Sequence, residues 1–169
     1  MSRVVLSIGS NLGDPLANLR SVVDTLGERL IAASAVYVTP PWGGVEQQDF
    51  LNATLIAQDP ALDCRGWLRF GQDLERQADR VRDVRWGPRS LDVDVVDCDG
   101  IVSADPELTL PHPRAHLRAF VLVPWLEIDP DAALTVDGTP VPVRDLLAAL
   151  DPADVAGVRR TDAELVASS

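Results

Sequence analysis

The feature that most constrains the fold is an alternation of acidic and aliphatic residues between Leu91 and Val96 (LDVDVV). Residues two apart on a strand project from the same face about 7 Å apart, so Asp92 and Asp94 face one way and the intervening aliphatic side chains face the other. Two carboxylates on one face repel each other unless water surrounds them or positive charge lies between them. The pattern therefore predicts either an edge strand with a solvated acidic face or a strand that holds Mg²⁺. This ion typically takes one or two carboxylates together with waters and substrate phosphates.

The sequence just before this strand is locally basic in an acidic chain. Residues 76–89 contain five arginines and two acids, and Trp86 and a Gly87-Pro88 turn lie among them. A solvated run of charge would explain the arginines, but the acidic strand that follows immediately also favours a phosphate site. The chain contains no lysine, so a Walker-type loop and the strand lysine of protein kinases are excluded. Any bound phosphate therefore has to be held by arginine and metal.

Composition limits the class of protein further. A length of 169 residues, 46% of them hydrophobic, predicts a single domain over residues 1–169, with a peripheral tail from about residue 151. The net charge of -11 argues against nucleic acids and anionic membranes as partners. Cys64 and Cys98 form no CxxC pair and no histidine stands at zinc-site spacing, so neither a disulfide framework nor a structural zinc is expected. With no signal sequence and no apolar run of about 18 residues, we expect a soluble, cytoplasmic monomer.

Hydrophobic periodicity predicts the order strand, helix, strand, strand, helix, strand, which is the βαββαβ arrangement of a ferredoxin-like α+β fold. Asp14 and Pro15 are favourable starting residues for the first helix. The expected strands are residues 3–8, 32–39, 50–57 and 91–96, and the expected helices are residues 15–30, 62–78, a late helix starting near 113 or 114, and 143–150. This order predicts an antiparallel sheet with both long helices on one side and the late helix covering the other, in three α/β/α layers.

Two groups of polar residues lie on predicted secondary structure, one on a strand and one on a helix. Asn52 shares a strand face with Phe50 and Thr54, which suits either an amide turned toward a loop or one that contacts a planar heterocyclic ligand. Gln72 and Glu75 are three apart beside the packed stripe of a helix, so they can jointly address one group. Both groups are candidate binding residues.

Two other patterns carry weaker signals. The GSNLG segment at residues 9–13 has neither Rossmann nor Walker spacing, so we interpret it as a tight turn rather than a phosphate loop. His112 and His116 are four apart but lack the intervening glutamate of zinc proteases, so shared metal binding is not expected.

Five segments together make the sequence recognisable. SIGSNLGD, TPPWGG with DFLNA, ERQADRVR, RWGPRSLDVDVV and LTLPHPRAHLRAF follow one another over roughly residues 4–128. In this order they resemble the 6-hydroxymethyl-7,8-dihydropterin pyrophosphokinase family of folate biosynthesis. The resemblance implies that the pterin hydroxymethyl oxygen attacks the β-phosphorus of ATP, which moves pyrophosphate and releases AMP.

The resemblance also implies roles for single residues. Asp92 and Asp94 match carboxylates that hold two Mg²⁺ ions on the ATP phosphates, and Phe50 and Phe120 match aromatic residues that sandwich the pterin. The pterin-binding positions are Thr39, Pro40, Trp42, Phe50, Asn52 and Phe120. The nucleotide- and phosphate-binding positions are Gln72, Glu75, Arg82, Arg89, Val95, Thr109, His112 and Arg118. The catalytic positions are Arg80, Arg82, Trp86, Arg89, Asp92 and Asp94, and those before residue 90 belong to a loop that closes over the substrates.

The sequence departs from the family pattern at three positions. Phe50 stands where tyrosine is common, Pro113 where some relatives have an aromatic residue, and Glu107 where some have an arginine near the nucleotide. The general base is open between Asp94 and a hydroxyl made acidic by metal. Two rival functions are a metal-dependent phosphodiesterase and a non-catalytic nucleotide-binding module.

Overall fold

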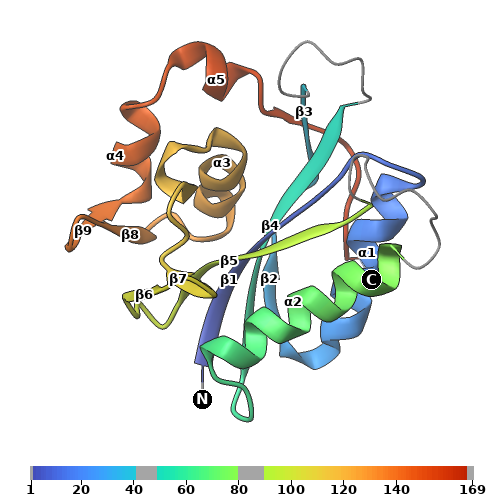
Figure 1. Cartoon of the computed structure of the whole chain (residues 1–169). Helices are drawn as coiled ribbons and strands as arrows, with labels where there is room; N and C mark the ends of the chain where they lie inside the picture. Colours follow the sequence, from blue (N-terminus) through green and yellow to red (C-terminus); the bar gives the residue numbers. More distant parts are fainter. Residues whose placement is uncertain (1, 41–48, 80–89, 167–169) are drawn as a thin grey trace.

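The computed structural model describes residues 2–40, 49–79 and 90–166. They form a mixed α/β structure around a six-stranded antiparallel sheet, in which the strands follow the order β10-β3-β4-β1-β5 and β2 also pairs with β4 (Figure 1). The sheet strands are β1 (Ser2–Ser10), β2 (Leu30–Ala33), β3 (Tyr37–Thr39), β4 (Phe50–Asp59), β5 (Asp92–Cys98) and β10 (Arg159–Arg160). The helices are α1 (Pro15–Leu26), α2 (Cys64–Asp79), α3 (Ala119–Ile128), α4 (Val143–Ala148) and α5 (Pro152–Ala156).

Shorter elements connect these parts. Two hairpins are formed by β6 (Ser103–Asp105) with β7 (Leu108–Leu110), and by β8 (Ala133–Val136) with β9 (Thr139–Pro142). Single 3-10 turns occupy Gly27–Arg29 and Ala115–Leu117. None of the described helices is both long enough and apolar enough to cross a membrane.

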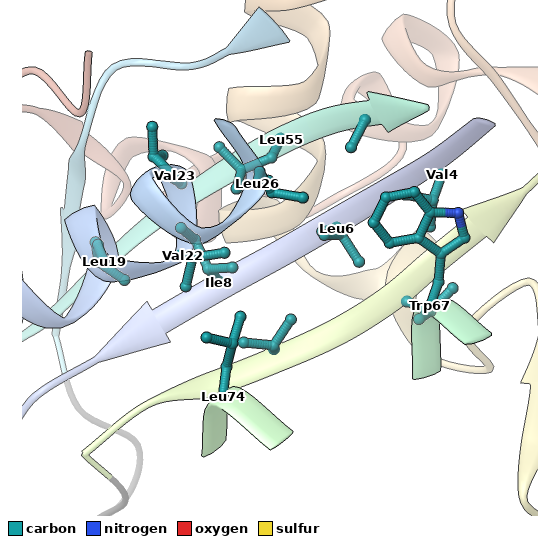
Figure 2. Packing of buried hydrophobic residues seen from close by; sticks show 14 of the residues in the cluster. Val4, Leu6, Ile8, Leu19, Val22, Val23, Leu26, Leu55, Trp67 and Leu74 are labelled. Carbon is teal, nitrogen blue, oxygen red and sulfur yellow. The ribbon is translucent and has the colours of Figure 1, made fainter. Parts of the chain in front are cut away.

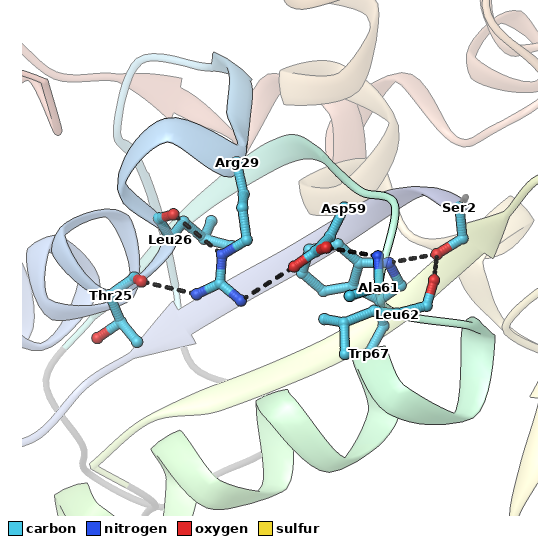
Figure 3. Close-up of polar contacts among 8 residues, drawn as sticks. All are labelled: Ser2, Thr25, Leu26, Arg29, Asp59, Ala61, Leu62 and Trp67. Atoms are coloured by element: carbon cyan, nitrogen blue, oxygen red, sulfur yellow. Dashed lines mark hydrogen bonds and ion pairs between the residues drawn. The ribbon is translucent and has the colours of Figure 1, made fainter.

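The first helix starts as predicted and ends earlier. The Asp14 side chain accepts a hydrogen bond from the Ala17 amide at 3.1 Å, and Pro15 occupies the first turn. Gly27 then adopts a left-handed φ of 56° and ends the helix, so Leu30 begins β2 instead of continuing the helical stripe. Arg29 covers the open end of the helix, because its guanidinium donates to the carbonyls of Thr25 and Leu26 (Figure 3).

One face of the sheet packs against α1 and α2. Leu6 and Ile8 of β1 meet the buried stripe of α1 and Trp67 and Leu74 of α2 (Figure 2). Trp67 is fully buried and its indole Nε1 donates to Ser2 Oγ at 2.8 Å, so its polar atom is satisfied (Figure 3). We expect Trp67→Ala to cost about 3–5 kcal/mol of stability, since it would leave a large cavity in this cluster.

The other face of the sheet packs against α3. Val5 of β1 and Ile56 of β4 are buried with Val121, Leu122 and Trp125 of the helix. Because neighbouring residues of a strand point to opposite faces, Leu6 and Val5 belong to different clusters. In Figure 1, α3 lies across the sheet from α1 and α2.

Three further predictions were also wrong. Residues 32–39 are not one strand, because the backbone leaves the sheet pattern between β2 and β3, where Ser34 pairs instead with Thr54 through its amide and its hydroxyl. The late helix begins at Ala119 rather than near Pro113, since Arg118 is extended (φ -111°, ψ 105°). Residues after Asp151 are not peripheral, since β10 pairs with β3 and Leu165 is buried in the same core cluster as residues of α1 and α2.

The expectation of no disulfide was also wrong. The sulfurs of Cys64 and Cys98 are bonded, with the two Cα atoms 5.8 Å apart. These residues are 34 apart in the sequence, and the start of α2 brings one of them to the end of β5 that carries the other. Spacing alone cannot reveal this contact, because it depends on how the helix docks on the sheet.

Candidate active site

The sheet register brings the predicted pterin and metal residues into one row. Gly9 of β1 pairs with Asn52 of β4 on one side and with Asp92 of β5 on the other. We call Asn52, Gly9 and Asp92 the central row. Asn52 and Asp92 are therefore two strand spacings apart, about 10 Å, on the face of the sheet that carries α3.

Gly9 leaves room in the middle of this row. A Cβ atom at this position would lie 2.8 Å from Asn52 Oδ1, closer than real Cβ contacts. The predicted tight turn at residues 9–13 was wrong at its first two residues, because Gly9 and Ser10 belong to β1. Glycine inside a strand pattern is the signal that could have revealed this close approach.

The end of the row that is predicted to bind the pterin is formed by β3 and β4. Asn52 is 5% exposed, and its Nδ2 donates to Thr39 Oγ1 at 2.7 Å. Phe50 is half-buried and pairs with Thr39 across the strands, and Pro40 follows in an exposed position. A hydrogen-bonding amide thus lies beside an aromatic ring, as the sequence predicted. Trp42 lies outside the described residues.

The acidic end of the row is formed by β5. Asp92 and Asp94 are half-buried while Val93 and Val95 are buried toward α1 and α2, which confirms the predicted alternation. Arg118 Nη1 lies 4.0 Å from Asp94 Oδ2, and its guanidinium is 5.6 Å from the centre of the Phe120 ring. The start of α3 therefore brings one arginine and one aromatic ring to this end of the site.

His112 lies beside the same strand. Its backbone amide donates to the Val96 carbonyl at 2.9 Å, and its Nδ1 accepts from the Arg114 amide at 3.2 Å. Burial lowers the pKa of His112, with the charge of Asp94 acting in the opposite direction. Because Nδ1 accepts from the Arg114 amide, a neutral imidazole here carries its proton on Nε2, where it can donate to an anionic oxygen.

Glu75 and Gln72 have different surroundings in the structure. Glu75 Oε2 accepts from the backbone amide of Val93 at 3.1 Å, and β5 is the last strand of the sheet, so this contact satisfies an outward-facing amide. Gln72 is exposed. Gly71 allows the close approach of α2, because a Cβ there would meet the Val93 side chain at 3.0 Å.

Two further predicted nucleotide positions differ in exposure. The Val95 side chain is buried in the cluster with α1 and α2, so contact with a ligand is limited to its backbone. Thr109 is exposed and its hydroxyl donates to the Asp105 carbonyl at 3.0 Å. The departure at Glu107 has a neighbouring counter-charge, since Arg65 pairs with Glu107 at 3.2 Å and with Asp105 at 2.7 Å.

Most of the arginine-rich segment before β5 falls between two ranges that the structure describes, residues 49–79 and 90–166. Arg80, Arg82, Trp86 and Arg89 lie outside the described residues, so their roles stay predictions. After them, the Ser90 carbonyl accepts from Asn18 Nδ2 at 3.0 Å and from the Ser10 hydroxyl. Asn18 Nδ2 also donates to Ser10 Oγ at 3.1 Å. Ser10 of the GSNLG motif and Asn18 of α1 therefore anchor the entry to β5, a role that sequence reasoning missed.

The carboxylates of Asp92, in the central row, and of Asp94, two residues later on β5, fit Mg²⁺. Asp92 and Asp94 supply hard oxygen donors on one strand face, which suits an ion that keeps waters and binds substrate phosphates. Within the described ranges, one group of three potential ligands is clustered, with Cys64, Cys98 and Asp99 having donor atoms within 4.8 Å of one another. Its two sulfurs are joined in the disulfide at the opposite end of β5, so that group does not offer thiolates.

Comparisons with known proteins agree with this geometry. The model of the family described as 7,8-dihydro-6-hydroxymethylpterin-pyrophosphokinase (HPPK) matches residues 5–130. The chain is 59% identical to the 2-amino-4-hydroxy-6-hydroxymethyldihydropteridine pyrophosphokinase of Mycobacterium tuberculosis over 168 residues, covering 94% of this chain and 89% of the relative. It is 45% identical to the protein of the same name from Methylorubrum extorquens over 159 residues. This match covers 92% of this chain and 98% of that relative.

A solved structure supports the fold. The wild-type HPPK-DHPS chain of Plasmodium falciparum is similar with a TM-score of 0.63 at 13% identity. The match covers 87% of this chain and 44% of that one, so this chain spans less than half of the HPPK-DHPS length. The chain belongs to the 7,8-dihydro-6-hydroxymethylpterin-pyrophosphokinase family.

Proposed function

We propose that this protein transfers pyrophosphate from ATP to the hydroxymethyl group of 6-hydroxymethyl-7,8-dihydropterin and releases AMP, as a step of folate biosynthesis. The observation that carries the proposal is the central row, in which an amide suited to a flat heterocycle and a carboxylate suited to metal flank one glycine. A ligand lying over Gly9 would have its ring edge at Asn52 and its reacting substituent toward Asp92. Family membership supports the same reaction.

Each end of the site has a separate task. Asn52 and Thr39 would read the hydrogen-bonding edge of the pterin, and Phe50 and Phe120 would stack on its faces. A buried amide left unpaired by a wrong ring gives selectivity, because its lost hydrogen bond is not replaced by water. Asn52 is already oriented by Thr39, so little reorganisation is needed on binding.

The acidic end would hold the phosphates in line with the pterin hydroxyl. Asp92 and Asp94 would hold two Mg²⁺ ions, which when bound polarise the phosphoryl oxygens and neutralise developing charge. Arg118 and the Nε2 proton of His112 would donate to phosphate oxygens from the α3 side. Arg80, Arg82, Trp86 and Arg89 would belong to a loop that closes over both substrates.

The remaining expectations belong to the same proposal. We assign the core to the ferredoxin-like βαββαβ class with α3 as the third layer, which is supported by the strand order β5-β1-β4-β3. The working unit is a cytoplasmic monomer with one domain over residues 1–169, whose partners are small molecules and not nucleic acid or membrane.

A nucleotide balance tests the function. Protein, Mg²⁺, ATP and 6-hydroxymethyl-7,8-dihydropterin are mixed, and AMP, ADP, phosphate and pterin products are quantified by chromatography. AMP should form only with pterin present, in equal amount to pyrophosphorylated pterin, and chelation of Mg²⁺ should stop it. Formation of ADP or free phosphate, or hydrolysis of a phosphodiester without pterin, would overturn the proposal in favour of a rival function.

A further inference from the structure

Glu127, in the last turn of α3, accepts hydrogen bonds from the segment between β2 and β3, where the sheet is interrupted. The backbone amide of Ala35 donates to both of its carboxylate oxygens, at 3.2 and 3.1 Å. The Tyr37 hydroxyl donates to Glu127 Oε1 at 2.6 Å. One side chain of the helix thus fixes two points of the chain just where the sheet pattern breaks.

The segment that Glu127 holds leads directly into the candidate pterin site. Tyr37 pairs with Asn52 across β3 and β4, and Thr39, two residues later, pairs with Phe50 and accepts the hydrogen bond of Asn52. β3 is three residues long, so a shift at Tyr37 moves Thr39 as well. Glu127 therefore bears on the position of the amide and the first aromatic ring.

The same helix carries the second aromatic ring. Phe120 and Glu127 are seven residues apart, which is about two helical turns, so they lie on the same side of α3. Between them the Thr54 hydroxyl donates to the Val121 carbonyl at 3.3 Å. The contacts of Val121, Leu122 and Trp125 with Val5 and Ile56 are apolar, and apolar packing is not directional. Pro124 further weakens the middle of the helix, because it has no amide to donate to the Phe120 carbonyl.

We propose that Glu127 is a positioning residue for pterin binding, which sets the separation between Phe120 on α3 and Phe50 on β4 by tying the end of the helix to Ala35 and Tyr37. This inference rests on the proposed function. A planar ring held between two aromatic faces needs them roughly 7 Å apart, two van der Waals contacts, so a small shift of the helix weakens both stacks. The phosphate end depends less on Glu127, because Asp92 and Asp94 lie on β5, which β1 separates from β4 and β3 in the sheet.

The contact persists at neutral pH. Burial of the hydroxyl raises the pKa of Tyr37 to about 12, with the hydrogen bond and the charge of Glu127 adding to the effect. Tyr37 consequently stays protonated and donates throughout the physiological range.

Steady-state kinetics and pterin binding of three variants test the inference. Glu127→Gln keeps the size but loses the charge, and Tyr37→Phe removes one donor. Asp131→Asn, which neutralises an exposed acid beyond the helix, is the matched control. Glu127→Gln should raise the KM and Kd for the pterin about three- to tenfold, the effect of one exposed charge-assisted hydrogen bond, while the KM for ATP changes less than about twofold. Tyr37→Phe should act in the same direction and add little to Glu127→Gln, because both break one contact.

The following kinetic results would overturn the inference about Glu127. A pterin KM of Glu127→Gln equal to wild type, or the same increase in Asp131→Asn, overturns the inference. Equal increases of the KM values for ATP and pterin together with a lower melting temperature would mean general destabilisation and overturn it as well. A wild-type protein that forms no pterin-dependent AMP overturns the proposed function and this inference together.

Discussion

Gly9 and Asn52 lie opposite each other on β1 and β4, and the amide oxygen of Asn52 lies 2.8 Å from the position that a Cβ atom at residue 9 would take. The side chain is held at its other end by Thr39, which accepts from Nδ2. The amide is therefore wedged between a hydroxyl and a bare backbone carbon, and its orientation depends on glycine in the neighbouring strand.

Gly9→Ala should weaken pterin binding with little loss of stability. The added methyl would lie 2.8 Å from Asn52 Oδ1 and force the amide away from Thr39. Gly9 is a strand residue whose φ is not positive, so alanine is tolerated by the backbone. We expect the pterin KM to rise about tenfold, the loss of one buried hydrogen bond, with the ATP KM serving as internal control. An unchanged pterin KM in a folded variant would contradict the role of Gly9.

Asp94→Asn should remove turnover while the fold survives. The change deletes one of two carboxylates proposed to hold Mg²⁺, so we expect kcat to fall by about 100-fold or more. The ion pair with Arg118 spans 4.0 Å and is partly exposed, so its loss should change the free energy of unfolding by about 1 kcal/mol or less. Chemical denaturation and the AMP assay measure the two quantities on one sample. Unfolding of the variant would instead mean that the acidic strand is structural.

Reduction of the Cys64–Cys98 disulfide should lower stability but leave activity intact. The bond closes a loop with a sequence separation of 34, for which chain entropy predicts a stabilisation of about 3–4 kcal/mol. Cys98 ends the strand that Asp92 begins, so the site is remote from the bond. Urea denaturation with and without reductant checks the prediction, and Cys64→Ser with Cys98→Ser is the control that reductant should not affect. Two titratable thiols in the untreated protein would show that the bond is absent.

Stability should fall at alkaline pH because of Tyr37. Its pKa is about 12 in the folded protein and near 10 when unfolded, so its contribution is complete below pH 10 and disappears as pH rises toward 12. Over this window the wild type should lose about 3 kcal/mol more unfolding free energy than Tyr37→Phe, as an upper value for one buried phenol. Denaturant titrations at pH 9, 10, 11 and 12 give the comparison. Parallel curves for the two proteins would contradict the burial of the hydroxyl.

Local patterns were sufficient for much of the fold. Asp14 and Pro15 predicted the start of α1, and the alternation around Asp92 and Asp94 predicted which side chains enter the core. The Asp137-Gly138 pair, a sequence typical of tight hairpin turns, joins β8 to β9, with both residues at positive φ. These features depend on residues close in the sequence, for which capping, turn geometry and strand periodicity are local properties.

The errors share a different cause. The break between β2 and β3 depends on Glu127, which is 92 residues away from Ala35, and the edge strand β10 comes from the far end of the chain. Likewise, the orientation of Glu75 toward Val93 depends on the docking of α2, which Gly71 permits. Hydrophobic periodicity carries no information about such partners.

By itself, the sequence determined the chemistry available to this protein: two carboxylates on one strand face, arginine as its only long basic side chain, and an amide beside an aromatic ring. Only the tertiary structure decided how these groups face one another. Antiparallel register set Gly9 between Asn52 and Asp92, and the packing of α3 brought Arg118 to Asp94 and Glu127 to Tyr37. The reason is physical, because a side chain's chemistry is covalent and local, whereas its distance to a residue on another strand or helix is fixed by the cooperative packing of the whole core.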